Sequence, residues 1–185
     1  VKLVYYGETY EHRPLFVAIV STPDNMGKLE DIRKDNLRRT GVLEGTPSTK
    51  VALNWMQYNV HGNEAVATEA AMMTFWQIAD PKNTQSKEWL KNQVLILDPC
   101  ANPDGKDRYT VWYNQKQNKR LQPDPQSMEH SEPWPGGRPN HYLLDLNRDW
   151  AWQTQQETQQ RLKLYHDWMP HLFVDYHEQG INDPF

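Results

Sequence analysis

The stretch from Val51 to Val60 is mostly apolar and runs directly into His61-Gly-Asn-Glu64, after which a helical pattern begins at Ala65. This pattern predicts a buried strand whose carboxyl end presents an imidazole and a carboxylate in the turn before a helix. Open α/β sheets place their ligand sites at the carboxyl ends of strands. The stretch therefore predicts both an α/β fold and a site at one end of the sheet.

Other parts of the chain fit the same architecture. Apolar segments predict further strands, and amphipathic segments predict helices that alternate with them. The expected strands are 1–6, 15–21, 94–97, 143–146 and 172–176, and the expected helices include 65–79 and 148–168. Strands that alternate with helices indicate an α/β domain with a mainly parallel or mixed sheet.

Length and charge narrow the possible partners. A chain of 185 residues is expected to form a single domain, 1–185. A net charge of −4 gives no reason to expect a nucleic-acid partner, and no apolar run approaches the ~20 residues of a membrane span. The N-terminus lacks a signal-peptide pattern, but cleavage could have removed one, so the compartment stays open.

Cys100 is the single cysteine, which excludes an internal disulfide. It could be a nucleophile with histidine partners elsewhere in the chain. Its position after the apolar run 94–97 favours a small, buried and unreactive side chain instead.

Residues 106–140 are rich in Gln, Asn, Pro and Gly and predict a long irregular loop. Trp112, Tyr113 and Trp134 favour a packed loop, which could line or cover a cleft. Glu129, His130 and Glu132 suggest a second metal site, but the surrounding prolines favour a solvated segment.

His177 follows the apolar strand 172–176, just as His61 follows the strand at 51–60. Two histidines and Glu64 make up the His₂Glu set of a catalytic zinc site, which keeps a fourth position open. The alternatives are structural. Glu64 could be a first-turn carboxylate favoured by the helix dipole, and His177 could be satisfied by Asp175 or Glu178.

The segment Gly137-Arg-Pro-Asn-His-Tyr-Leu-Leu-Asp-Leu-Asn-Arg148 resembles the Gly-Arg…Asp-Leu-Asn-Arg signature of the zinc carboxypeptidases, the carboxypeptidase A-like family. Three more segments fit that family in the same order: His61-Gly-Asn-Glu64, Asn102-Pro-Asp-Gly105 and Asp175-Tyr-His-Glu178. The resemblance extends from the hairpin at 10–15 to His177. It implies a three-layer αβα fold with a mixed, largely parallel central sheet.

The resemblance also implies a metal centre. His61, Glu64 and His177 would hold one zinc ion, and Asp145 would accept a hydrogen bond from the first zinc histidine. A carboxylate behind a ligand histidine fixes the tautomer of the ring and raises its basicity.

Three further residues match positions that act on the substrate in this family. Arg138 would polarise the scissile carbonyl and stabilise the oxyanion, while Asn147 and Arg148 would bind the C-terminal carboxylate of the substrate. The planar guanidinium of arginine suits a carboxylate. Arg108 and Arg120 are alternative candidates for the oxyanion role, but the spacing of Arg138 to Asn147 favours Arg138.

These polar residues also have simpler interpretations. Asn147 could cap the helix that follows, and Arg148 could pair with Asp149 or Asp145 at the surface. The segment Asn102-Pro-Asp-Gly105 is expected to be a structural turn even within the family.

The resemblance places the general base, a glutamate, and a substrate-capping tyrosine well downstream of the third zinc ligand. The chain ends eight residues after His177, at Phe185. Glu178 is a poor substitute, because adjacent strand residues point to opposite faces. We therefore expect 1–185 to be the N-terminal portion of a catalytic domain that is incomplete at its C-terminus.

The expected function is a zinc metallocarboxypeptidase that hydrolyses a C-terminal peptide bond with a zinc-activated water. Its partner would be a peptide with a free C-terminal carboxylate, and the resemblance favours a secreted or periplasmic protein. The alternatives are a zinc amidase or deacylase, a hydrolase of side-chain or cell-wall peptides, and a non-catalytic binding module without the base.

Overall fold

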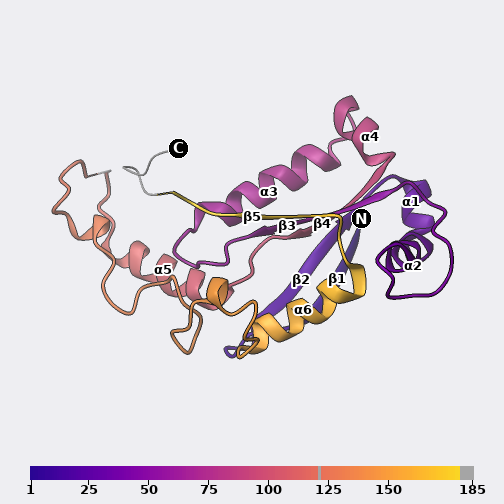
Figure 1. Ribbon diagram of the computed structural model, residues 1–185. Coiled ribbons are helices and arrows are strands. Elements are labelled where there is room, and N and C mark those ends of the chain that lie inside the picture. The colour runs from indigo at the N-terminus through magenta and orange to yellow at the C-terminus, as the bar shows by residue number, and fades with distance from the viewer. Residues whose placement is uncertain (121, 180–185) are drawn as a thin grey trace.

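The structure is a computed structural model that describes residues 1–120 and 122–179 (Figure 1). In chain order its elements are β1 (Lys2–Glu8), β2 (Pro14–Val20), α1 (Pro23–Gly27), α2 (Leu29–Arg39), β3 (Ala52–Tyr58), α3 (Val66–Ala79), α4 (Thr84–Leu90), β4 (Gln93–Asp98), α5 (Pro103–Lys116), the short 3₁₀ helices Met128–His130 and Leu146–Arg148, α6 (Gln156–Trp168) and β5 (Leu172–Tyr176).

The strands form one mixed sheet in the order β1-β2-β4-β3-β5. β3 runs parallel to both β4 and β5, whereas β2 is antiparallel to β1 and β4. Helices cover both faces: α3 and α4 lie on one side, and α2 and α6 lie on the other (Figure 1). The predicted αβα layering and mixed sheet are confirmed.

Alternation along β3 explains how the sheet is buried on both faces. Leu53 and Trp55 are fully buried in the cluster that α2 and α6 cover, whereas Tyr58 packs against Ala71 of α3. Side chains two apart along a strand share a face, so Gln57 points to the same side as Trp55. Gln57 is also fully buried and thus brings a polar group to the end of this apolar row.

The carboxyl ends of β3 and β5 meet at one edge of the sheet. The two strands are parallel neighbours in which Tyr58 pairs with Tyr176, and the two rings stack with centroids 4.4 Å apart. The turns after these strands therefore start side by side. This register brings His61 close to His177, although a long stretch of sequence separates them.

The prediction of an irregular loop over 106–140 is wrong for the first part of that range, because α5 extends to Lys116. The helix begins at a combined cap: the Asn102 side chain accepts a hydrogen bond from the backbone N–H of Gly105, and Pro103 occupies the first turn. These residues resemble turn signals in the sequence, but here they start a helix. Irregular chain predominates only after residue 116.

Two further expectations around the signature segment are wrong. Residues 143–146 form no strand, because Leu143 has a φ of 61° and the chain then enters the 3₁₀ helix at Leu146. The helix expected from residue 148 starts only at Gln156. The Asp149 carboxylate accepts hydrogen bonds from the backbone N–H groups of Thr154 and Gln155, which close a loop before the helix.

Candidate active site

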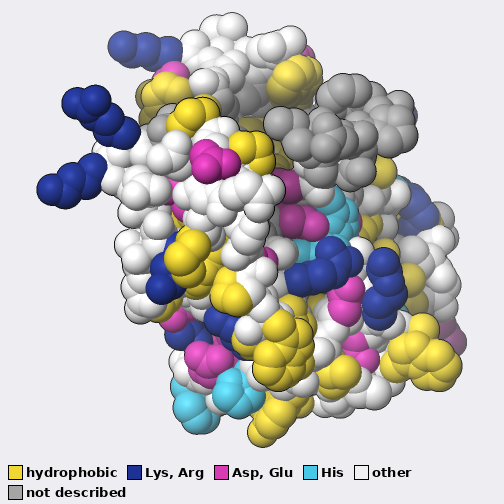
Figure 2. Space-filling view, turned by 90° about the vertical axis from the view of Figure 1, so that its left-hand side faces the viewer, with side chains coloured by type: hydrophobic (Ala, Val, Ile, Leu, Met, Phe, Trp, Pro, Cys, Tyr) yellow, Lys and Arg dark blue, Asp and Glu magenta, His cyan; other side chains and the backbone are white. Residues whose placement is uncertain are grey.

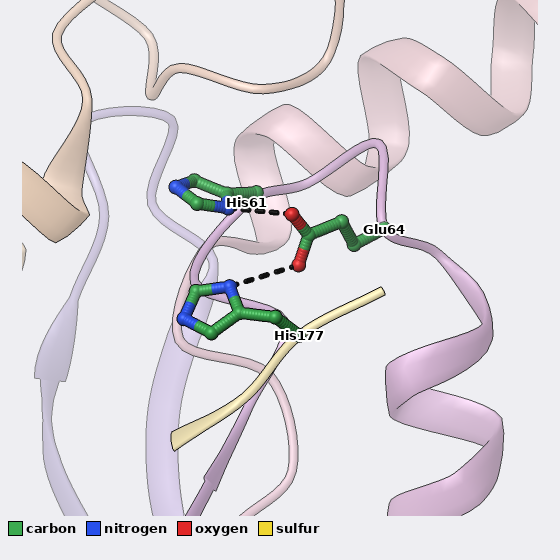
Figure 3. A group of neighbouring side chains, drawn as sticks. All are labelled: His61, Glu64 and His177. Carbon is green, nitrogen blue, oxygen red and sulfur yellow. Dashed lines mark hydrogen bonds and ion pairs between the residues drawn. The ribbon is translucent and has the colours of Figure 1, made fainter. Parts of the chain in front are cut away.

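Three side chains converge beyond the carboxyl ends of β3 and β5 (Figure 3). His61 Nδ1 lies 2.6 Å from Glu64 Oε1, and His177 Nδ1 lies 3.1 Å from Glu64 Oε2. One ligand atom from each of the three residues lies within 4.8 Å of the others. The carboxylate therefore sits between two imidazoles that present the same ring nitrogen to it.

The local environment keeps Glu64 ionised. Burial raises the pKa of its carboxyl, but hydrogen bonds from His61 and the backbone N–H of Glu178 offset this effect. Together with the charges of His61 and His177, they hold the pKa below its ordinary value. The group thus offers one anionic and two imidazole donors, a set suited to a divalent cation.

Asp145 lies behind His61, on the opposite side of the ring from Glu64. Its Oδ1 is 3.2 Å from His61 Nε2, and its Oδ2 forms an ion pair with Arg138 Nη2 at 3.0 Å. Burial raises the pKa of the Asp145 carboxyl, but the N–H of Asn147 and the charges of His61 and Arg138 lower it below its usual value. Asp145 therefore lies between the His61 ring and the Arg138 guanidinium.

Arg138 is an arginine that reaches the group of His61, Glu64 and His177. Its Nη1 lies 3.2 Å from His61 Nδ1 and 3.9 Å from Glu64 Oε1. Arg108, by contrast, donates hydrogen bonds to the backbone carbonyls of Gly136 and Asn140 and so stabilises the loop around residues 136–140. Arg120 is exposed and has no contact with the group among the described residues.

Asn147 and Arg148 lie at the rim of the same end of the molecule. Asn147 Nδ2 is 3.5 Å from His177 Nε2. The Arg148 side chain is exposed and lines a shallow hollow with Leu144 and Trp152. Within the described part of the chain its guanidinium has no ion pair with Asp145 or Asp149, and Asp145 rather than Asn147 caps the 3₁₀ helix. Figure 2 looks onto this end and shows histidine, acidic and basic side chains gathered together.

A sequence model of the family described as zinc carboxypeptidase matches residues 1–173. The chain belongs to the zinc carboxypeptidase family. Carboxypeptidase 2 of Trichophyton rubrum is 27% identical over 135 residues, covering 71% of this chain and 19% of the fungal protein.

Solved structures of zinc carboxypeptidases share the fold. The metallo-carboxypeptidase from Burkholderia cenocepacia superposes with a TM-score of 0.62 at 17% identity, covering 96% of this chain and 36% of its own. The metallo-carboxypeptidase from Pseudomonas aeruginosa gives a TM-score of 0.59 at 17% identity, covering 94% and 34%. This zinc carboxypeptidase chain thus spans about a third of these structures and about a fifth of the fungal relative.

Other candidates from the sequence are held in structural roles. Glu178 accepts a hydrogen bond from the backbone N–H of Val66 at the start of α3. Burial raises the pKa of the Cys100 thiol to about 11, which favours the unreactive interpretation. Glu129 is buried and accepts the N–H groups of Asn118 and Gln122, so the solvated segment expected there is wrong for this residue.

Sequence reasoning did not anticipate how the signature loop is pressed against the His61 turn. A Cβ atom on Gly62 would lie 2.1 Å from the carbonyl carbon of Gly105 and 2.4 Å from the oxygen of Gly137. Only a residue without a side chain permits this approach. This close packing places Arg138 next to His61. Gly62, directly after His61, was the sequence feature that could have indicated it.

Within residues 1–120 and 122–179, no helix has the length and hydropathy that a membrane span requires.

Proposed function

We propose that this protein is a zinc-dependent metallocarboxypeptidase that hydrolyses the C-terminal peptide bond of its substrates. The observation that carries the proposal is the convergence of His61, Glu64 and His177, with Arg138 directly beside them.

The three residues fit a zinc ion. Zinc bonds to imidazole nitrogen and carboxylate oxygen are about 2 Å long, so two donors on one ion lie roughly 3–4 Å apart. The donor atoms here lie within 4.8 Å of one another, which is close to the spacing that one zinc ion requires. When bound, zinc would act as a Lewis acid and lower the pKa of a coordinated water to about 7.

Arg138 and Asp145 would act on either side of His61. With zinc bound, Asp145 would accept a hydrogen bond from His61 Nε2, 3.2 Å away, and the Nδ1 lone pair would bind the metal. Arg138 would direct its guanidinium at the carbonyl oxygen of the scissile bond and stabilise the negative charge that develops there.

Asn147 and Arg148 would select the substrate by its terminal carboxylate. The Arg148 guanidinium is exposed and free of ion pairs among the described residues, and Asn147 lies beside His177. An arginine can donate two parallel hydrogen bonds to a carboxylate. This pair supports exopeptidase rather than endopeptidase activity.

The general base would come from outside the described residues. Glu178 directly follows His177 in the chain, but its carboxylate accepts the backbone N–H of Val66 at the start of α3. It therefore does not serve as the base in this proposal.

Metal analysis after zinc loading and desalting tests the centre. We expect one zinc ion per chain in the wild type and far less in His61→Ala. His166→Ala removes an exposed histidine on α6 and serves as the matched control with full zinc content. Equal zinc in His61→Ala and the wild type would overturn the assignment of the ligands.

Paired substrates test the reaction. A peptide with a free C-terminal carboxylate should be hydrolysed, whereas the same peptide with a C-terminal amide should not. Equal hydrolysis of both would favour an amidase or deacylase. Zinc binding without hydrolysis of either peptide would favour a binding module.

A further inference from the structure

A second carboxylate lies behind the second histidine of the site. Asp175 Oδ2 is 3.1 Å from His177 Nε2, matching the 3.2 Å between Asp145 Oδ1 and His61 Nε2. We propose that Asp175 is a positioning residue that fixes the His177 ring with Nδ1 directed at the metal. This inference rests on the zinc centre proposed above and adds a residue that acts through one of its ligands.

The chemistry of the contact selects one ring tautomer. An ionised carboxylate only accepts hydrogen bonds, so Asp175 requires a proton on His177 Nε2. A neutral ring with its proton there carries a lone pair on Nδ1, the atom that faces Glu64. Without a cation, the Glu64 carboxylate at 3.1 Å also accepts from this ring and competes with Asp175 for its proton, whereas a cation on Nδ1 removes that competition. Asp175 therefore leaves Nδ1 able to bind a cation.

Asn147 is the competing neighbour of the same ring atom. If its Nδ2 donated to His177 Nε2, the ring proton would sit on Nδ1, which is the wrong tautomer for binding a metal through that atom. The Asn147 contact is longer, 3.5 Å against 3.1 Å for Asp175. Of the two neighbours of Nε2, the carboxylate is thus the closer partner, and the Asn147 amide stays available to a substrate.

Gln57 holds Asp175 in place from the next strand. The two residues are directly paired in the β3–β5 register, and Gln57 Nε2 donates to Asp175 Oδ1 at 3.0 Å. Gln57 is fully buried, so its amide has little freedom to move away. One oxygen of Asp175 is therefore anchored to the sheet while the other faces His177.

Asp175 is placed to orient the ligand rather than to bind the metal itself. Its Oδ2 contacts the Nε2 side of the ring, whereas the Nδ1 atoms of both histidines face Glu64. Among the described residues the candidate metal-binding group comprises His61, Glu64 and His177 without Asp175.

The test uses Asp175→Asn, which keeps the size of the side chain but replaces an acceptor with a donor. We expect zinc affinity, measured by competition with a chelator, to fall about 10–100-fold. Asp107→Asn makes the same change at an exposed acid that pairs with Arg13, and it should bind zinc like the wild type. Gln57→Met keeps the carboxylate but removes its anchor, and we expect a smaller loss in the same direction.

Nitrogen-15 NMR of metal-free Glu64→Ala, which lacks the competing carboxylate on Nδ1, reads the tautomer directly at a pH where the ring is neutral. We expect the proton on Nε2 of His177 in Glu64→Ala and a shift toward Nδ1 when Asp175→Asn is added. A purely structural role for Asp175 would change thermal stability without moving these ring signals.

Wild-type zinc affinity in Asp175→Asn, or a His177 ring protonated on Nδ1 in Glu64→Ala, would overturn the inference. A wild-type protein that takes up no zinc would instead contradict the proposed function. In that case the ring signals in metal-free Glu64→Ala still decide whether Asp175 sets the tautomer.

Discussion

Arg138 Nη1 lies 3.2 Å from His61 Nδ1, the ring atom that also faces Glu64. The Nδ1 atom therefore lies between the Glu64 carboxylate and the Arg138 guanidinium, while the other ring nitrogen faces the carboxylate of Asp145. A metal ion on Nδ1 would meet the positive charge of Arg138 at close range. We expect this repulsion to move the Arg138 side chain away from His61 when the metal binds.

Arg138→Ala should separate metal binding from catalysis. Removing a positive charge beside the metal ligands should leave zinc affinity unchanged or higher. The kcat for peptide hydrolysis should fall about 10²–10³-fold, as expected for loss of an oxyanion donor. Chelator competition and steady-state kinetics measure the two effects.

Arg120→Ala is the matched control, because Arg120 is an exposed arginine and was one of the two alternative candidates for this role. It should change neither the zinc affinity nor the kcat for peptide hydrolysis. A loss of zinc in Arg138→Ala with normal kcat would show that the side chain supports the metal site instead.

Arg148→Ala should weaken the binding of substrates that carry a free C-terminal carboxylate. A charge-assisted hydrogen bond contributes about 1.5–3 kcal/mol, so KM should rise roughly 10–100-fold. Zinc content should not change, because Arg148 has no contact with the three ligands among the described residues. Steady-state kinetics on a free-acid peptide provide the measurement.

Arg148→Lys tests whether the planar guanidinium matters, since lysine keeps the positive charge but cannot donate two parallel hydrogen bonds to a carboxylate. We expect it to recover only part of the affinity. An unchanged KM in Arg148→Ala would remove this residue from the substrate site.

The sequence predicted the strands that build the site because their apolar runs and polar ends lie close together in the chain. It also predicted that His61 and His177 would meet, since both follow strands of one sheet. The contacts that orient them were harder to predict. Gln57 is a single polar residue in an apolar strand, and its role depends on β5 being the neighbour of β3. That order is a property of the whole sheet.

Local signals around the signature segment were ambiguous. Asn102 and Pro103 are equally good turn residues and helix starters, and tertiary packing decides between them. The stretch after Arg148 has helical composition, but Asp149 binds the backbone of Thr154 and Gln155 and delays the helix. Such capping depends on the exact path of the chain, which periodicity does not specify.

Gly62→Ala should destabilise the fold, because the new methyl group would overlap the backbone at Gly105 and Gly137. Overpacking of this kind costs about 1–3 kcal/mol and more where backbone must move. Zinc affinity should fall as well, since Gly62 directly follows His61. Denaturant unfolding and chelator competition measure these effects.

Gly27→Ala is the control for the chemistry of the change. A Cβ atom there would meet nothing within 4 Å, and the residue ends helix α1. We expect a change in the free energy of unfolding of less than about 1 kcal/mol. Equal effects of the two substitutions would contradict the close packing proposed for the His61 turn.

Asp98 should make stability depend on pH. The carboxyl is fully buried under α6 and accepts a hydrogen bond from the Tyr6 hydroxyl at 3.1 Å. Burial raises its pKa from 3.8 to about 7, although the charge of Arg161 and the Tyr6 hydrogen bond act in the opposite direction. The folded protein thus holds this proton more tightly than the unfolded chain. Stability from this group is present at low pH and is lost as pH rises from about 4 to about 7.

Asp98→Asn keeps the shape and the acceptor for Tyr6 but removes the titration. Relative to the wild type, it should gain up to a few kcal/mol in free energy of unfolding at about pH 8, and nothing at about pH 4. Urea unfolding across this range measures the difference. Asp31→Asn, at an exposed acid on α2, should leave the pH dependence unchanged. If Asp98→Asn instead lost stability at about pH 8, the carboxylate would be ionised and stabilised by Arg161 in the folded protein.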